Sequence, residues 1–461
     1  MFVVLGFLSV LVKAQELPLL KVSDNQKYIV TQNNKPFFWL GGTAWELIHR
    51  LNKDEIDLYL TDRAKKGFTV IQTVVLAELD GLNTPNAYGE KPLINNDPTR
   101  FNKKYFELVD YVVNRAEGLG LYTALLPTWG DKFNKGWGVG PVVFNPDNAE
   151  IYGEMIARRY LSHNNIIWIL GGDRVPANAE QADIIRAMAK GIRKIDTIHL
   201  ITYHPSGGKN ATDFFNGDWL DLDMFQSGHS RLSKEYNYVL KSRKKVPLRP
   251  VINGEARYEN IPDRFWEKEK HGWLDAADAR ESAYWSIISG AAGYTYGSND
   301  IWQMYDWTRT PGINARTDWE VSLNLPGSAQ MGYMKKLFES FSWQSMTYDP
   351  SLIQENNPED TSYIVAALGN NKKFILAYSP VGKPIEIDAS GLKTDTIQSY
   401  WFNPRSGTIK YIGEFSKRTN MKFKPWADGW GSDFLLIICD QKLDEVAFNN
   451  NHDFIKDLVH K

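Results

Sequence analysis

In Ile166-Ile167-Trp168-Ile169-Leu170-Gly171-Gly172-Asp173, five apolar residues are followed by two glycines and a carboxylate. A continuous apolar run of this length is typical of a strand that is buried on both faces. The flanking residues have helical patterns, over 146–161 before the run and over 179–195 after it. A strand between two helices is the repeating unit of α/β proteins with a parallel sheet.

The same unit recurs in both directions along the chain. Eight strands are predicted, at 37–42, 70–76, 121–129, 166–170, 200–204, 224–226, 250–255 and 293–297. Helices are predicted at 54–66, 106–119, 146–161, 179–195, 232–242, 276–288 and 329–340. Eight strand–helix units over this length are what a (β/α)8 TIM barrel requires. No G-x-G-x-x-G motif follows the first strand, so a doubly wound sheet is disfavoured. We therefore expect an α/β protein with a catalytic barrel over residues 20–345.

The pattern differs at the two ends of the barrel. Segments 27–31 and 36–39 flank a polar turn, which predicts an N-terminal hairpin capping the bottom of the barrel. Beyond residue 341, short strands are separated by glycine, proline and asparagine turns. This pattern predicts a small antiparallel β-sandwich over 346–445. A polar tail over 446–461 is expected to follow it.

The first residues indicate export. Residues 2–12 are apolar, which is shorter than the ~20 residues of a membrane-spanning helix but suits a signal peptide. We expect residues 1–14 to be a signal peptide, with a buried N-terminal segment as the alternative. No second apolar run of spanning length follows, so the expected location is periplasmic, cell-surface or secreted.

Composition excludes several classes of protein. The 53 Lys and Arg against 55 Asp and Glu give a net charge of -2, which argues against a nucleic-acid partner. The single Cys439 excludes a disulfide scaffold, a cysteine-based zinc module and an iron–sulfur site. The chain is rich in aromatics, with 16 Trp, 22 Tyr and 22 Phe. Aromatic rings can stack on sugar C–H faces, so the position of these residues relative to the strand ends decides whether they indicate a saccharide partner.

Two carboxylates follow strands that lie opposite each other in the predicted barrel. Asp173 ends the fourth strand and Glu255 ends the seventh, and a barrel places its active site at these ends. Two facing carboxyls are the minimal equipment of a glycosidase. A helix N-cap for Asp173, and an ion pair of Glu255 with Arg257 or Arg280, are the structural alternatives.

Further residues at or near the strand ends are predicted to bind the substrate. They are Trp45, Glu46, Gln72, Trp129, His204, Gln226, His229, Tyr296 and Trp302. Trp137 and Tyr203 fall in the same zone, although any single ring could instead pack a loop.

Metal and serine chemistry are the competing mechanisms. His204 and His229 could join the two carboxylates on a cation, but neither H-x-H nor H-E-x-x-H occurs. A serine nucleophile lacks its G-x-S-x-G motif. We expect no metal and no cofactor.

Three segments resemble one family of enzymes. They are Phe38-Trp39-Leu40-Gly41-Gly42-Thr43-Ala44-Trp45-Glu46, Trp168-Ile169-Leu170-Gly171-Gly172-Asp173 and Asn253-Gly254-Glu255, which look like motifs of the apiosidase-like enzymes, glycoside hydrolase family 140. Trp401-Phe402-Asn403-Pro404-Arg405-Ser406-Gly407 resembles a sandwich domain often attached to these barrels and described as collagen-binding. The resemblance covers about residues 20–440.

This resemblance implies a (β/α)8 glycosidase acting on pectic side chains, with apiose in rhamnogalacturonan II as the family substrate. It implies Asp173 as general acid/base and Glu255 as nucleophile, and we expect a retaining reaction on an oligo- or polysaccharide. Two alternatives remain at this point. One is a non-catalytic carbohydrate- or matrix-binding protein on the same scaffold, and the other is a metal-dependent hydrolase.

Overall fold

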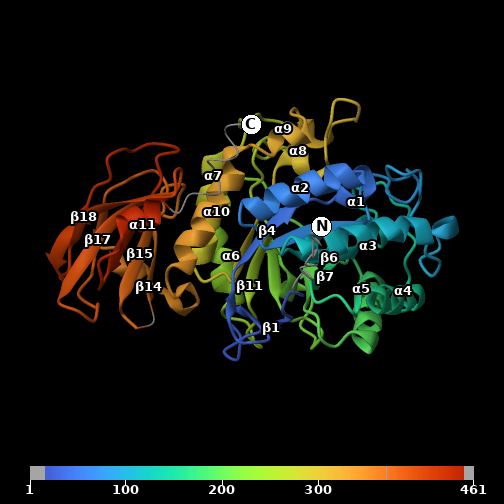
Figure 1. Ribbon diagram of the computed structural model, residues 1–461, viewed down its shortest axis with the longest axis horizontal. Helices are drawn as coiled ribbons and strands as arrows, with labels where there is room; N and C mark the ends of the chain where they lie inside the picture. Colours follow the sequence, from blue (N-terminus) through green and yellow to red (C-terminus); the bar gives the residue numbers. More distant parts are fainter. Residues whose placement is uncertain (1–15, 370, 451–461) are drawn as a thin grey trace, which may run out of the picture.

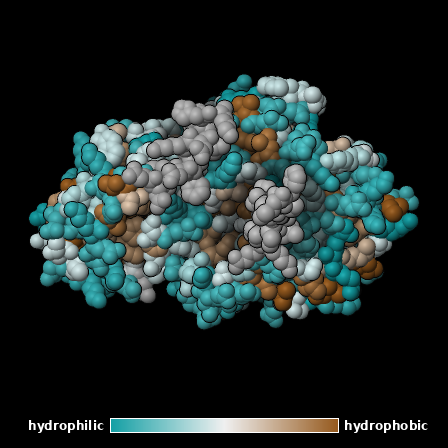
Figure 2. Space-filling view, viewed as in Figure 1, coloured by the Kyte–Doolittle hydropathy of each residue, from teal (hydrophilic) through white to brown (hydrophobic). Residues whose placement is uncertain are grey.

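A computed structural model describes residues 16–369 and 371–450, so the predicted signal peptide over 1–14 lies outside the described residues. The strands of the C-terminal region (orange to red in Figure 1) lie beside a larger α/β barrel. On the face seen in Figure 2, hydrophilic residues dominate over both parts, and hydrophobic residues form small scattered groups. Within the described part of the chain, no helix combines the length and the apolar character needed to cross a bilayer.

Eight parallel strands form a nearly closed barrel, which confirms the predicted fold class. They are β4 (Trp39–Thr43), β5 (Val70–Leu76), β6 (Tyr122–Thr128), β7 (Ile166–Gly171), β8 (Ile201–His204), β10 (Asp223–Gln226), β11 (Val251–Glu255) and β12 (Gly293–Tyr296). The sheet order is β8-β7-β6-β5-β4-β12-β11-β10, with the short β9 (Lys209–Asn210) antiparallel at the β10 edge. The ladder is interrupted between β8 and β10, where the Asp221 N–H donates to the Ile201 carbonyl at 2.9 Å.

The helices surround this barrel. The seven predicted ones are α2 (Lys53–Lys65), α3 (Lys103–Gly118), α4 (Pro146–Tyr160), α5 (Ala179–Ile195), α6 (Glu235–Ser242), α7 (Ala276–Ile288) and α10 (Pro326–Glu339), all within three residues of expectation. The short α1 (Leu47–Arg50), α8 (Asn299–Trp302) and α9 (Trp319–Ser322) were not predicted. Capping boxes at Asn52, Asn145 and Asp275 satisfy the first N–H groups of α2, α4 and α7, which explains their sharp starts.

Alternate residues of each strand enter two separate cores. On β7, Ile167 and Ile169 fill the barrel interior, while Trp168 and Leu170 pack outward against the helices. Both faces are therefore apolar, which accounts for the uninterrupted hydrophobic run in the sequence.

The N-terminal hairpin is present and gains a third strand. β1 (Leu20–Val22), β2 (Ile29–Thr31) and β3 (Pro36–Phe37) form an antiparallel sheet. The Phe37 ring meets the ring of Tyr122 edge-on at 5.1 Å. Tyr122 begins β6, so this sheet closes the end of the barrel opposite to the strand termini that carry the predicted site.

The C-terminal region is an antiparallel β-sandwich. A six-stranded sheet has the order β13 (Met346–Tyr348), β14 (Val365–Gly369), β15 (Phe374–Ser379), β20 (Phe434–Cys439), β17 (Thr396–Asn403) and β18 (Thr408–Ser416). A ribbon of β16 (Ile385–Ile387) and β19 (Met421–Phe423) covers one face of this sheet through a shared apolar core.

The other face of the sheet packs on the barrel, on the side where α7 and α10 lie (Figure 1). The rings of Tyr378 and Tyr284 stack with centroids 4.6 Å apart. Of the predicted tail, the described part forms α11 (Glu445–Asn450), whose Phe448 ring contacts Phe402. The remainder, 451–461, lies outside the described residues.

Candidate active site

A cavity of about 800 Å³ lies at the carboxyl ends of the barrel strands. Both predicted carboxylates, Asp173 and Glu255, line it. Loops that follow several strands supply the rest of the wall, namely Trp45, Glu78, Leu79, Trp129, Trp137, Gln226, His229, Tyr258, Phe265, Trp266, Trp302 and Ile313, with parts of segments 206–208, 227–233 and 312–313. The volume is that of a ligand site, and its wall is largely apolar and aromatic with a few polar groups.

Three successive left-handed residues place Asp173. Gly171, Gly172 and Asp173 have φ values of 94°, 93° and 54°. A Cβ on Gly171 would lie 2.5 Å from the His204 carbonyl, and one on Gly172 would lie 2.8 Å from the Gly130 nitrogen. The two glycines are therefore required both by conformation and by space. Asn178, not Asp173, caps α5, so the N-cap alternative does not apply.

A break in strand pairing turns Glu255 into the same cavity. Between β10 and β11 the register shifts, so that Gln226 lies opposite Glu255. A bulge of this kind re-aims a side chain at a strand end. Gln226 Nε2 donates to Glu255 Oε1 at 3.0 Å, and His229 Nε2 lies 3.1 Å from the same oxygen.

His204 links the two carboxylate residues. The backbone N–H of Asp173 donates to His204 Nδ1 at 3.2 Å, while His204 Nε2 lies 3.2 Å from Glu255 Oε2. Because Nδ1 accepts a hydrogen bond, the neutral ring carries its proton on Nε2, which faces Glu255. His204 therefore orients one catalytic candidate through its backbone and the other through its side chain.

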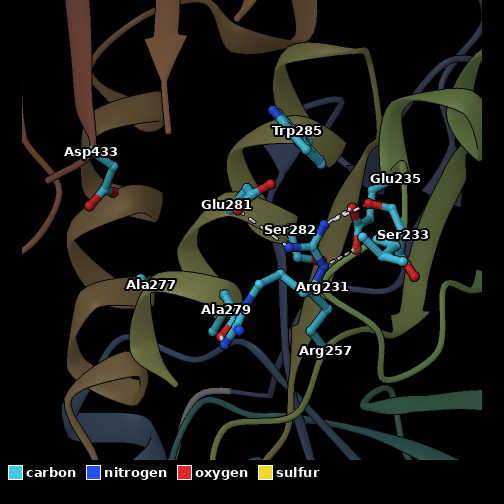
Figure 3. A network of polar contacts seen from close by, with 12 residues as sticks. Arg231, Ser233, Glu235, Arg257, Ala277, Ala279, Glu281, Ser282, Trp285 and Asp433 are labelled. Carbon is cyan, nitrogen blue, oxygen red and sulfur yellow. Dashed lines mark hydrogen bonds and ion pairs between the residues drawn. The ribbon is translucent and has the colours of Figure 1, made fainter. Parts of the chain in front are cut away.

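The arginines considered as partners of Glu255 form their ion pairs elsewhere. Arg257 lies between Glu235 and Glu281 (Figure 3), at 2.9 Å and 3.4 Å respectively. Arg280 pairs with Asp433 at 2.7 Å. The Arg257 cluster ties the chain just after Glu255 to α6 and α7, so it fixes the backbone without neutralising the carboxylate.

The two carboxylates differ in proton affinity. Burial alone would raise the pKa of Glu255, but the hydrogen bonds and charges of His204 and His229 outweigh it and hold that pKa well below its usual range. Burial and the charge of Glu255 raise the pKa of Asp173 above its usual value, against the opposing effect of Arg174. Glu255 is thereby kept ionised, whereas Asp173 holds its proton to a higher pH than an ordinary aspartate, the difference in proton affinity that acid-assisted nucleophilic displacement uses.

Chemistry that requires a metal would need at least three converging ligands. Among the residues that the structure describes, no group of three or more His, Cys, Asp and Glu side chains is placed to hold an ion. The two histidines that approach Glu255 instead contact different oxygens of its carboxylate.

Comparison with known proteins assigns the family. The family model described as "Apiosidase-like, catalytic domain" matches residues 23–345. The chain belongs to the apiosidase-like family of glycoside hydrolases. A second model, described as "Putative collagen-binding domain of a collagenase", matches residues 348–439. No curated protein matches the chain.

Solved structures agree with this assignment. A protein described as a glycoside hydrolase is 32% identical, with a TM-score of 0.85, covering 93% of this chain and 98% of its own. A glycoside hydrolase family 5 protein from Bacteroides vulgatus is also 32% identical, with a TM-score of 0.86 and coverage of 94% and 96%. A family 39 glycoside hydrolase from Bacteroides cellulosilyticus, 12% identical at a TM-score of 0.51, shares the fold alone, over 89% of this chain and 84% of its own. The apiosidase-like chain is thus a glycosidase by family. The two relatives that are 32% identical align with both its barrel and its C-terminal sandwich.

Most of the predicted binding residues lie in or beside the cavity of this apiosidase-like barrel. Trp45, Trp129, Gln226, His229 and Trp302 line the cavity, and Trp137, also anticipated, stands over Arg174 with 3.8 Å between guanidinium and ring. The Trp45 and Trp129 rings are 5.2 Å apart and form one aromatic wall. His204 lies behind this wall in contact with both rings.

Four predicted residues do not line the cavity, namely His204, which lies behind the aromatic wall, and Tyr296, Gln72 and Glu46, and this corrects the expected ligand contacts. Tyr296 points outward from β12, where its hydroxyl donates to Glu259 Oε2 at 2.6 Å. Gln72 lies inside the barrel below the cavity, where its Nε2 donates to the Gly254 carbonyl at 2.8 Å. Glu46 is fully buried behind the wall and accepts hydrogen bonds from the backbone of Glu78. Tyr203, noted in the same zone, is also buried and donates its hydroxyl proton to the Arg174 carbonyl.

Several residues of the cavity wall were not predicted from the sequence. Glu78 follows β5 by two positions, so the strand-end rule applied once more would have found it. Phe265 and Trp266 come from the long loop between β11 and α7. No periodicity marks such a loop, so these two rings had no signal in the sequence.

Replacing His229 by alanine should shift the pH profile of this apiosidase-like enzyme. As the expected nucleophile, Glu255 would have to be ionised, and His229 helps to hold its pKa low. Without His229 the pKa of Glu255 rises, so the acidic limb of kcat/KM should move to higher pH by about one unit. The matched control is His163→Ala, because the His163 side chain is partly exposed. This variant should leave the acidic limb of kcat/KM unchanged. If the acidic limb of the His229→Ala variant did not move, or moved to lower pH, the role of His229 in lowering the pKa of Glu255 would be contradicted.

Proposed function

We propose that this protein is an exported glycosidase that cleaves pectic side chains, of the rhamnogalacturonan II type, by a retaining double displacement. The observation that carries the mechanism is the pair of carboxyls in one cavity with opposite shifts in proton affinity. The family description supports apiose as the sugar released. Export is supported by the apolar segment 2–12, which has the length of a signal-peptide core.

The first displacement assigns one task to each carboxyl. Glu255 attacks the anomeric carbon, and the bond to the leaving oxygen breaks as Asp173 transfers its proton to that oxygen. A covalent glycosyl ester on Glu255 forms, and the alcohol departs. The His204 and His229 ring nitrogens near the Glu255 oxygens orient the carboxylate before attack.

The second displacement reverses the roles. Asp173, now ionised, takes a proton from water while the water oxygen attacks the anomeric carbon and Glu255 leaves. The sugar is released with the configuration it had in the substrate. Trp45 and Trp129 provide a ring wall on which the flat face of the sugar can stack.

The test uses purified full-length protein and a panel of pectic polysaccharides that includes rhamnogalacturonan II. We expect release of apiose, and NMR of the earliest product should show the same anomer as the substrate. A different released sugar would overturn the substrate assignment. An inverted first product would overturn the retaining mechanism. No released sugar from any member of the panel would overturn the proposed function.

A further inference from the structure

A third carboxyl group lies in the cavity beside the catalytic pair. Glu78 is partly exposed and lines the cavity together with Trp45, Trp129 and both catalytic carboxyls. Within the described part of the chain, no protein group donates a hydrogen bond to the Glu78 carboxyl. Neither the two-carboxyl mechanism nor the packing of the barrel uses this side chain.

A buried ionic cluster holds the backbone that carries Glu78. Glu46 Oε1 accepts the N–H groups of Glu78 and Leu79, each at 3.2 Å. Glu46 Oε2 lies 2.6 Å from His49 Nδ1 and 3.8 Å from Arg50 Nε. Burial would raise the pKa of Glu46, but His49 and Arg50 outweigh it and lower that pKa, so Glu46 is ionised.

The same cluster fixes the loop at a second point. His49 Nε2 lies 3.1 Å from the carbonyl of Thr84, six residues beyond Glu78. Burying charged groups costs free energy. In this cluster, the buried side chains of Glu46 and His49 form hydrogen bonds with the backbone of one loop. The effect is to present the Glu78 side chain to the cavity from a rigid backbone, as a binding group requires.

The protonation of Glu78 suits hydroxyl recognition. Burial at the cavity wall and the nearby charge of Asp173 raise the pKa of Glu78 to about 8. At neutral pH its carboxyl therefore keeps a proton and can both donate and accept hydrogen bonds. A sugar hydroxyl also does both, so the two groups are complementary.

We propose that Glu78 is a specificity-determining residue, which hydrogen-bonds hydroxyl groups of the glycosyl unit held between Asp173 and Glu255. This inference rests on the proposed function and deepens it. Glu78 selects sugars whose hydroxyls face the β5 side of the cavity, and it takes no part in bond cleavage.

The test compares Glu78→Ala with the near-isosteric Glu78→Gln, using the pectic polysaccharide that the wild type cleaves. Alanine should lower kcat/KM by about 10- to 100-fold, because sugar hydroxyls lose a hydrogen-bond partner inside the cavity. Glutamine keeps a donor and an acceptor, so it should stay within about 5-fold of the wild type. Asp80→Asn is the control on the same loop, since the Asp80 carboxylate bonds Asn83, away from the cavity. It should leave kcat/KM unchanged.

A second measurement separates recognition from folding. In the Glu255→Gln background, which should not turn over, binding of a pectic oligosaccharide is followed by tryptophan fluorescence. Adding Glu78→Ala should raise Kd by about the factor lost in kcat/KM, with an unchanged melting temperature. A lowered melting temperature with an unchanged Kd would show a structural role and overturn the inference.

Failure of the proposed function would be visible separately. If the wild type releases no sugar, the proposed function falls, and Glu78 is judged on oligosaccharide binding alone. Binding that Glu78→Ala weakens would still support the assignment. Binding that it leaves unchanged, or the absence of saccharide binding by the wild type, would overturn it.

Discussion

Replacement of Glu255 by glutamine is expected to lower kcat by about 10⁴-fold or more while leaving the fold intact. The amide has nearly the shape of the carboxylate, so its oxygen can keep the contacts with Gln226 and His229, while its NH2 group cannot accept from His204. It cannot form the glycosyl ester, however, because it lacks the negative charge that attacks the anomeric carbon. Hydrolysis of the pectic substrate and thermal unfolding, measured on the same preparation, check both halves of this prediction.

Asp173→Asn provides the matched control, because the two carboxyls have different tasks. A leaving group that is already a good anion needs no proton, so an aryl glycoside with a nitrophenolate leaving group bypasses the acid in the first step. The Asp173→Asn variant should form the covalent intermediate from such a substrate, while Glu255→Gln should not. Normal turnover by Glu255→Gln would refute the assignment of the nucleophile. Loss of the intermediate in Asp173→Asn with an aryl substrate would refute the division of roles.

The barrel strands could be predicted because they are buried on both faces. The run Ile166–Leu170 is apolar without interruption, and Val70–Leu76 is apolar apart from Gln72 and Thr73, a pattern that loops and amphipathic helices do not show. Helix ends were predictable to within three residues where asparagine or aspartate caps begin them, as at Asn145 and Asp275. The two glycines before Asp173 were equally informative, since their left-handed conformation is what turns that carboxylate into the cavity.

The catalytic pair could be predicted from strand-end position, but the rest of the wall needed finer geometry. Alternation along β12 places Thr295 inside the barrel, where it accepts a hydrogen bond from Trp39, so its neighbour Tyr296 must point outward. Strict alternation from the inward Ile252 would have pointed Glu255 outward as well. The register shift beside Gly254 reverses this, and one sequence gives no sign of such a shift.

The contacts between the barrel and the sandwich could not be predicted from the sequence. Arg280 on α7 and Asp433 before β20 are 153 residues apart along the chain, and each alone resembles an ordinary surface charge. In the structure both are buried, and Arg280 donates to both Asp433 oxygens, with its Nε 2.9 Å from Oδ2. The Tyr378 hydroxyl donates to the same carboxylate at 3.1 Å, and Arg405 Nη1 donates to the Asp433 carbonyl at 2.7 Å.

Replacing Asp433 by alanine should therefore lower the free energy of unfolding by about 3–5 kcal/mol, because Arg280 would be left buried without its counter-charge. In the wild type, the Asp433 carboxylate outweighs the effect of burial and raises the pKa of Arg280. An arginine side chain keeps its proton in proteins, so the guanidinium of the variant cannot escape the cost by becoming neutral. Strand β20 begins directly after Asp433, and its sheet packs against the barrel on one face. We therefore expect the barrel and the sandwich of the wild type to unfold together in denaturant. In Asp433→Ala the midpoint should fall, and unfolding of the sandwich should separate from that of the barrel.

The matched control for this prediction is Asp395→Ala, which removes the carboxylate of an ion pair at the surface. The Asp395 side chain is 94% exposed and lies 3.3 Å from Lys417, so its removal should change stability little. The double variant Arg280→Met with Asp433→Leu removes both buried charges and should regain most of the loss. Arg405, which also pairs with Asp433 at 3.2 Å, is partly exposed and keeps its hydrogen bond to the backbone carbonyl of residue 433. If Asp433→Ala were no more destabilising than Asp395→Ala, the buried pair would not hold the two parts together. The sandwich would then depend on its apolar contacts alone, such as the stacking of Tyr378 on Tyr284.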